Sequence, residues 1–333
     1  MTTAFVLSGG GSLGAMQVGM LRALFRAGIR PGRVYGTSIG SLNGAALAFD
    51  PTVGGVERLA TLWHDIGRHD VYPLDLRQGA RAVVRSLPWL PVGLLRATGA
   101  LNRAFPVRPL TAVAGLVGLT DHAVPSGPEA RLLRSIVGDR RLEDTVVPFE
   151  AECAEVTSGR LVSLTTGPAV PALLASTAIP GVFAPQHVGE HELMDGGVAD
   201  NTALDRALED GADEVYVLPT GFSCDLPPAP RSALGMAVHG LSVLIEQRLV
   251  SALHRSDPRV PVHVVPPLCP LSVVPVDFGS SDLLITEADR ATEQWLANGR
   301  NPVAGTSRAL GQHADEEPLD LTRMPDRPAP RQV

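Results

Sequence analysis

The sequence feature that most constrains the fold is the pentapeptide Gly36-Thr37-Ser38-Ile39-Gly40. It follows the apolar pair Val34-Tyr35 and precedes a run of small and apolar residues, which predicts a strand, a tight turn and a helix. A serine on such a strained turn needs glycine neighbours, because other backbone passes close to it. The turn exposes the hydroxyl, and the helix that follows directs N–H groups toward developing negative charge. The spacing therefore indicates a nucleophile at Ser38, although an ordinary strand-to-helix turn shares it.

A glycine-rich loop, Gly9-Gly10-Gly11-Ser12-Leu13-Gly14, lies between an expected strand at 3–8 and an expected helix at 15–27. It fits the G-x-G-x-x-G pattern of dinucleotide-binding folds. Those folds also need an acidic residue at the end of the second strand, where this chain has Gly36-Thr37-Ser38. The other use of such a loop is to present backbone N–H groups to an oxyanion. In a parallel sheet the two loops would be neighbours, so each supports the other.

A serine nucleophile needs a base, and the sequence offers two kinds. None of the nine histidines follows a late strand in a loop of small residues. Asp195 does, because it ends an expected strand at 191–194 and is followed by Gly196 and Gly197. An Asp-Gly turn would look the same. Asp195 is therefore a candidate for the base, and a histidine base stays open as the alternative.

Together these motifs resemble those of the patatin-like phospholipases over roughly residues 4–218. The resemblance rests on the loop from Gly9 to Gly14, the turn around Ser38 with Gly36 and Gly40, the segment Ala178-Ile179-Pro180-Gly181-Val182-Phe183, and Asp195-Gly196-Gly197 with Asn201 after it.

The resemblance implies an α/β fold in three layers, with a mostly parallel central sheet flanked by helices. It implies a serine hydrolase that cleaves carboxylic esters of phospholipids or other acyl lipids through an acyl-enzyme intermediate, without a cofactor or metal. Ser38 would be the nucleophile and Asp195 its base, and Gly9, Gly10 and Gly11 would supply the oxyanion N–H groups. Family members often carry Arg or Lys in this loop, where the chain has Leu13. That difference removes a loop cation but leaves the backbone donors.

Three alternatives remain at this stage. The chain could be a hydrolase with a Ser-His-Asp triad, although its serine follows the second strand, earlier than is usual for that class. It could be a non-catalytic lipid-binding or scaffold protein that keeps the fold. It could bind a nucleotide, which the missing acidic residue disfavours.

Composition narrows the class of protein further. The net charge of −7 argues against nucleic-acid binding, and the 28 basic residues are all arginine. Three scattered cysteines favour neither disulfides nor zinc. No signal peptide and no membrane-spanning stretch is expected, so we expect a cytoplasmic protein that can lie on the inner face of the membrane.

The region 76–108 has a composition of its own. It holds six arginines and no carboxylate, and Arg77, Arg81 and Arg85 share a helical face beside apolar residues that include Trp89. This pattern is typical of an interfacial segment, while a solvated helix face would also explain it. We expect residues 1–300 to form one hydrolase domain. Within it, 70–128 would form a helical cap, and 303–333 would form a disordered tail.

The remaining elements follow from periodicity. Further strands are expected at 149–156, 160–164, 214–218 and 260–265, and further helices at 56–66, 131–137, 171–176, 202–209, 232–252 and 282–297.

Overall fold

The computed structural model describes residues 1–68, 126–221, 233–268 and 278–300. In this part of the chain eight strands form one sheet, in the order β5-β6-β3-β2-β1-β7-β8, with β4 also paired to β3. The strands are β1 Thr3–Leu7, β2 Arg33–Thr37, β3 Phe149–Glu155, β4 Leu161–Leu164, β5 Gln186–Val188, β6 His191–Asp195, β7 Glu214–Leu218 and β8 Val262–Val264. The helices are α1 Ala15–Arg26, α2 Ile39–Phe49, α3 Val53–Arg68, α7 Gly127–Val137, α8 Ala169–Ser176, α9 Leu204–Glu209, α10 Ala233–Arg255 and α11 Ser281–Ala297. Four short 3-10 helices are η1 Gly11–Gly14, η2 Leu142–Asp144, η3 Gly196–Val198 and η4 Phe278–Ser280.

The sheet is mixed. Strands β3, β2, β1, β7 and β8 run parallel, whereas β4, β5 and β6 pair antiparallel. The expected α/β fold with three layers is confirmed, and the antiparallel strands are confined to one edge. Every element expected in the described residues is present, with ends shifted by a few residues. Strand β5 was not expected, because only three residues pair and none of them is fully buried.

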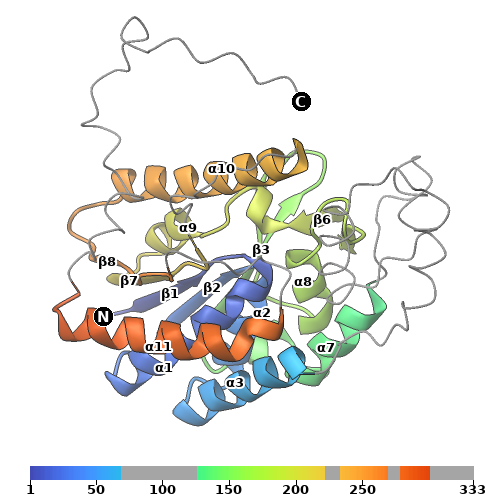
Figure 1. Cartoon of the computed structure of the whole chain (residues 1–333). Helices are drawn as coiled ribbons and strands as arrows, with labels where there is room; N and C mark the ends of the chain where they lie inside the picture. The colour runs from blue at the N-terminus through green and yellow to red at the C-terminus, as the bar shows by residue number, and fades with distance from the viewer. Residues whose placement is uncertain (69–125, 222–232, 269–277, 301–333) are drawn as a thin grey trace, which may run out of the picture.

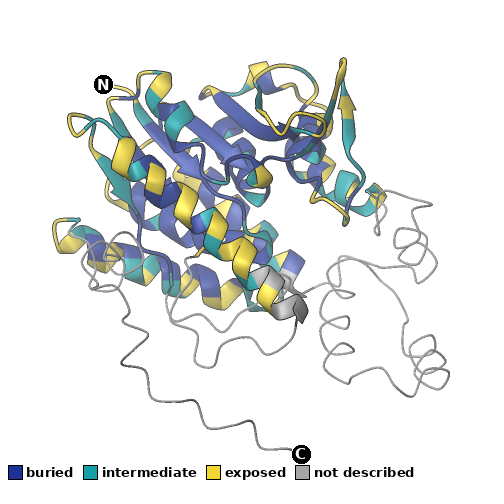
Figure 2. Cartoon of the chain, turned by 90° about the horizontal axis from the view of Figure 1, so that it is seen from above, coloured by how far each residue is buried: buried dark blue, intermediate teal, exposed yellow. Residues whose placement is uncertain are grey.

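Helices cover both faces of the sheet (Figure 1). Helices α9 and α10 lie on one face, and α1, α2, α3 and α11 lie on the other. Strand β1 serves both faces because successive side chains alternate: Phe5 and Leu7 join the core beneath α1, while Ala4 and Val6 join the core beneath α9. Strands β1, β2, β3 and β7 are buried almost throughout, whereas β4, β5 and β8 contain no fully buried residue (Figure 2).

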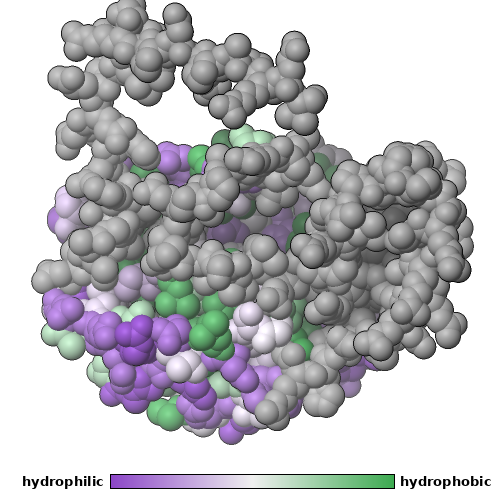
Figure 3. All heavy atoms as spheres, in the orientation of Figure 1, coloured by the Kyte–Doolittle hydropathy of each residue, from purple (hydrophilic) through white to green (hydrophobic). Residues whose placement is uncertain are grey.

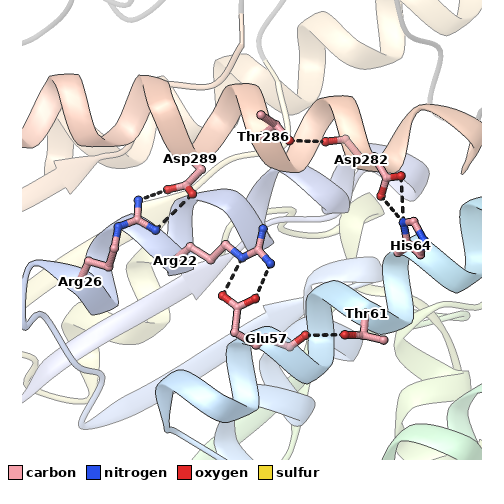
Figure 4. Close-up of polar contacts among 8 residues, drawn as sticks. All are labelled: Arg22, Arg26, Glu57, Thr61, His64, Asp282, Thr286 and Asp289. Carbon is pink, nitrogen blue, oxygen red and sulfur yellow. Dashed lines mark hydrogen bonds and ion pairs between the residues drawn. The ribbon is translucent and has the colours of Figure 1, made fainter.

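Helix α11 returns from the end of the described chain to pack along α1. The contact requires a glycine in α1, because a Cβ at Gly19 would lie 2.2 Å from the Ile285 carbonyl oxygen. Polar pairs then link the three outer helices: Arg22 with Glu57, Arg26 with Asp289, and His64 with Asp282 (Figure 4). In Figure 3 most of the surface over these helices, in the lower part of the view, is hydrophilic. Exposed ion pairs add little to the stability of a fold. The packing of α11 against α1 therefore holds this helix in place, and the pairs fix its position along α1 and α3.

Two carboxyl groups of β3, Glu150 and Glu152, are buried beneath α9. Arg206 of α9 donates to Glu150 over 3.0 Å. Glu152 accepts a hydrogen bond from Ser163 through Oε2 over 2.8 Å, but its Oε1 has no partner among the described residues. Burial is the main cause that raises the pKa of Glu152 to about 7.

This shift makes stability depend on pH. The folded-state pKa of about 7 exceeds the ordinary value of 4.5, so the free energy of unfolding falls as pH rises between those values. Glu152→Gln removes the titration, and its stability relative to the parent should improve by up to about 3 kcal/mol from pH 4.5 to pH 8. Denaturant unfolding at several pH values measures this, with the exposed Glu190→Gln as control. Parallel curves for Glu152→Gln and the parent would contradict it.

Candidate active site

Two strands meet end to end along one edge of β3. Strand β2 runs parallel to β3 until Thr37 pairs with Glu152, and β6 runs antiparallel to it until Asp195 pairs with Cys153. Because Glu152 and Cys153 are consecutive, the carboxyl ends of β2 and β6 face each other. The pairing register therefore brings the turn after β2 beside Asp195.

Ser38 occupies that turn with an unusual backbone. Its φ of 54° and ψ of −125° lie where L-residues are rarely found. Both adjoining peptide groups are held by buried serines. The Ser38 N–H donates to Ser176 Oγ over 3.1 Å, and the Ser38 carbonyl accepts from Ser41 N and Oγ over 2.8 and 2.6 Å. The strained conformation predicted for the serine is present, and neighbouring hydrogen bonds maintain it.

Gly36 and Gly40 are required by close backbone contacts. A Cβ at Gly36 would lie 2.5 Å from the Gly40 carbonyl oxygen. At Gly40 it would lie 2.2 Å from the Leu7 carbonyl oxygen at the end of β1. The spacing that singled out Ser38 thus has the steric origin expected of it.

Asp195 is buried and contacts Ser38 directly. Its carboxyl group accepts a hydrogen bond from the Gly197 amide over 2.8 Å, and hydrogen bonding to the Ser38 side chain is among the causes that lower its pKa. Among the described residues no histidine donates to it. Burial is the main cause that raises the pKa of Asp195 to about 6, against the lowering effect of these two hydrogen bonds. A carboxylate with this pKa is ionised at neutral pH and is a better proton acceptor than an exposed one.

The glycines after Asp195 and the residue Asn201 pack around this pair. A Cβ at Gly196 would lie 2.4 Å from the Glu152 carbonyl oxygen, so only glycine lets the chain turn this close to β3. A Cβ at Gly197 would lie 2.9 Å from Asn201 Oδ1. The two glycines thereby keep the chain after β6 packed against β3.

The glycine loop after β1 lies against the same site. A Cβ at Gly9 would lie 3.0 Å from Ser38 Cβ, so the loop and the serine are in contact. We expected the Gly9 N–H to be available for an oxyanion. In the structure it donates to the Asn201 carbonyl over 3.3 Å. Within the described residues no acceptor faces the N–H groups of Gly10 and Gly11. These two remain candidate oxyanion donors.

The loop continues into η1 and the hydrophobic core. A Cβ at Gly14 would lie 2.7 Å from the Ile39 side chain, so Gly14 lets η1 approach the start of α2. Asn43 of α2 donates to the Gly14 carbonyl over 3.0 Å, which ties the loop to the helix after Ser38. Leu13, where the family resemblance led us to look for a cation, joins the hydrophobic core.

Three residues near the site were not singled out from the sequence. Ser176 and Thr220 act through single hydroxyl groups, which leave no pattern in a sequence. Glu129 lies in the first turn of α7 close to Thr177, whose hydroxyl donates to the Leu173 carbonyl over 2.8 Å. Desolvation, with a smaller contribution from the Asp195 charge, raises the pKa of Glu129 to about 8. Glu129 is therefore mostly neutral at pH 7.

The cap and tail predictions lie outside the described residues. This applies to the arginine-rich region 76–108, to most of the expected cap at 70–128 and to the expected tail at 303–333. No cluster of metal-ligating side chains occurs in the described ranges.

Comparison with known proteins identifies the family of the chain. The family model described as "Patatin-like phospholipase" matches residues 5–208. The chain therefore belongs to the patatin-like phospholipase family. The matched stretch includes the glycine loop, Ser38 and Asp195 but ends before β7.

Similar sequences are longer than this chain. Patatin-like phospholipase domain-containing protein 7 of Rattus norvegicus is 26% identical over 220 residues, which cover 66% of this chain and 13% of that protein. Lysophospholipase NTE1 of Coccidioides immitis is 26% identical over 235 residues, which cover 68% of this chain and 12% of that protein. An uncharacterized NTE family protein of Mycobacterium tuberculosis is 28% identical over 197 residues, which cover 59% of this chain and 43% of that protein.

Solved structures are related more distantly. Human GIVD cytosolic phospholipase A2 in complex with a fluorophosphonate has a TM-score of 0.38 and 15% identity, over 93% of this chain and 59% of that one. ExoU of Pseudomonas aeruginosa in its complex with SpcU has a TM-score of 0.35 and 15% identity, over 91% of this chain and 52% of that one.

The close contacts at Gly40 lead to a stability prediction. In Gly40→Ala the new methyl group overlaps the Leu7 carbonyl at the end of β1, so the turn must shift, at a cost of about 1–3 kcal/mol or more. Gly240→Ala in α10 is the matched control, because in the described part of the chain no atom lies within 4 Å of its Cβ. The control should gain roughly 0.5–1 kcal/mol from reduced chain entropy. Chemical unfolding compares them, and equal stability of the two variants would contradict the packing argument.

Proposed function

We propose that the chain is a serine hydrolase that cleaves carboxylic ester bonds of acyl lipids with Ser38 as nucleophile and Asp195 as base. The observation that carries this proposal is the interaction of the Ser38 side chain with the buried Asp195 carboxyl group of raised pKa, next to the Gly10 and Gly11 amides, which have no acceptor among the described residues. A nucleophile, a base and a place for negative charge are the three parts that acyl transfer requires.

The proposed reaction has two stages. Ser38 Oγ attacks the ester carbonyl carbon while its proton passes to Asp195, and the N–H groups of Gly10 and Gly11 stabilise the oxyanion. The intermediate collapses, the ester C–O bond breaks, and the leaving alcohol takes the proton from Asp195. Water then attacks the acyl-enzyme with Asp195 again as base. This step releases the fatty acid and restores the Ser38 hydroxyl.

Phospholipids or lysophospholipids are the substrates that the family supports best. Relatives carry the names phospholipase and lysophospholipase, and the matched family model is described as phospholipase. The relatives are much longer than this chain, so their activities support the proposed substrate class without assigning it. The choice between hydrolysis and transfer of the acyl group belongs to the same proposal, and we assign hydrolysis.

The experiments below also test two alternative functions, a non-catalytic lipid-binding protein and a hydrolase with a histidine base. A non-catalytic lipid-binding protein would have no need of a strained serine beside a carboxylate. A hydrolase with a histidine base would need a histidine against Ser38. Among the described histidines, His64, His191 and His263 bond instead to Asp282, Glu155 and Glu214.

Membrane association also belongs to the proposal. The arginine-rich region 76–108 would bind anionic lipid and bring the site to its substrate. This rests on the sequence alone, because the region lies outside the described residues. None of the helices in the described ranges is long and apolar enough to cross a bilayer.

The proposal predicts how variants of the pair behave. Ser38→Ala should abolish ester hydrolysis and fluorophosphonate labelling. Asp195→Asn should lower kcat/KM by at least about 10³-fold while the protein stays folded, because the amide cannot accept the serine proton. His64→Ala and His191→Ala are controls that should keep most activity. Fluorophosphonate labelling that persists in Ser38→Ala would contradict the assignment, and an inactive histidine variant would favour a triad.

The raised pKa of Asp195 predicts the pH profile. The base must be ionised, so kcat/KM on a soluble ester should fall about tenfold per pH unit below pH 6. Glu129→Gln distinguishes the two neighbouring carboxyl groups. It removes the group with a pKa of about 8 and should leave the acid limb in place. A limb at the ordinary value of Asp, 3.8, would contradict a base of raised pKa at Asp195.

A further inference from the structure

Thr220 lies two residues beyond the end of β7, outside the stretch that the family model matches. Its side chain is buried. Its hydroxyl donates to the Gly9 carbonyl over 2.5 Å, and its N–H donates to Ser8 Oγ over 3.0 Å. Ser8 and Gly9, the first residue of the glycine loop, are therefore both fixed to the segment after β7.

The bond to Gly9 also sets the direction of the next N–H. The carbonyl of Gly9 and the N–H of Gly10 belong to one planar trans peptide group, so they point in opposite directions. Strand β1 lies between β2 and β7 (Figure 1), so Thr220 approaches the loop from one side and Ser38 from the other. With the Gly9 carbonyl held toward Thr220, the Gly10 N–H points toward the Ser38 side.

Gly10 depends on Thr220 in a second way. Its φ of 155° is reached most easily by glycine, and a Cβ there would lie 2.1 Å from Thr220 Oγ1. The hydroxyl thus occupies the space beside Gly10 that a side chain would need. Asn201 adds a longer bond of 3.4 Å from its Nδ2 to the same carbonyl. The Ser8 hydroxyl also donates to this carbonyl, over 3.3 Å, so without the Thr220 hydroxyl only two longer bonds would hold the peptide.

We propose that Thr220 is a positioning residue whose hydroxyl fixes the Gly9–Gly10 peptide so that the Gly10 N–H faces the oxyanion formed at Ser38. This inference rests on the proposed hydrolase function. Thr220 touches neither the ester nor Ser38 and acts through the loop alone. Loss of one well-oriented oxyanion donor typically lowers kcat by about 10²–10³-fold, so a misaligned donor should lower it by roughly 10–10²-fold.

The test compares four proteins on a soluble p-nitrophenyl ester. Thr220→Val keeps the side-chain shape but removes the donor, and Thr220→Ser restores the hydroxyl. Thr292→Val is the matched control, because Thr292 of α11 is also buried and donates to a backbone carbonyl over 2.7 Å. We expect Thr220→Val to lower kcat roughly 10–10²-fold with KM changed less than about threefold. Thr220→Ser should recover most of kcat, and Thr292→Val should match the parent.

A second measurement does not depend on activity. Amide hydrogen exchange of the loop 8–13 should be faster in Thr220→Val than in the parent and in Thr220→Ser, because the Gly9–Gly10 peptide is released. Unchanged exchange, an effect on KM alone, or failure of Thr220→Ser to recover kcat would overturn the inference. If the parent neither hydrolyses esters nor reacts with a fluorophosphonate, the proposed function fails, whereas the exchange comparison still decides whether Thr220 holds the loop.

Discussion

The arrangement of the site depends on strand β3, which pairs with two strands along the same edge. Strand β2 occupies the first half of that edge and β6 the second half, in opposite directions. A shift of β6 by one residue would turn Asp195 to the other face of the sheet, because side chains alternate along a strand. The contact between Ser38 and Asp195 is therefore a consequence of strand register. Gly196, packed on the Glu152 carbonyl, helps to hold that register.

The same arrangement lowers the stability of the folded chain. Ser38 has a backbone conformation that costs about 1–3 kcal/mol, and Asp195 and Glu152 carry pKa values raised by burial. Each raised pKa means that the ionised carboxylate is less favourable in the folded state than in the unfolded one. At Asp195 this cost accompanies a better proton acceptor. Glu152 has no such role in the proposed reaction, so its substitution separates stability from activity.

The sequence predicts those parts of the site that backbone geometry imposes on residue type. Ser38, Gly36 and Gly40 could be found because a strained turn with close backbone contacts accepts few residue types. Asp195 could be found because it precedes two glycines at the end of a strand. Single hydrogen bonds across the fold leave no such trace, so Thr220 and the occupied Gly9 N–H could not be found. The edge strand β5 was missed because its three residues are too few for a pattern.

Leu13 connects the electrostatics of the loop with the strength of the base. A cation in this loop would stabilise an oxyanion, but near Asp195 it would also lower the pKa of the carboxylate and weaken it as a proton acceptor. Leu13 instead packs into the core, and among the described residues no cation contributes to the pKa shift of Asp195. Stabilisation of the oxyanion then falls to backbone N–H groups, whose effect depends on how well they are aimed at the position of the oxyanion. In a chain without a loop cation, hydroxyl groups that orient peptides matter more, and this is the role inferred for Thr220.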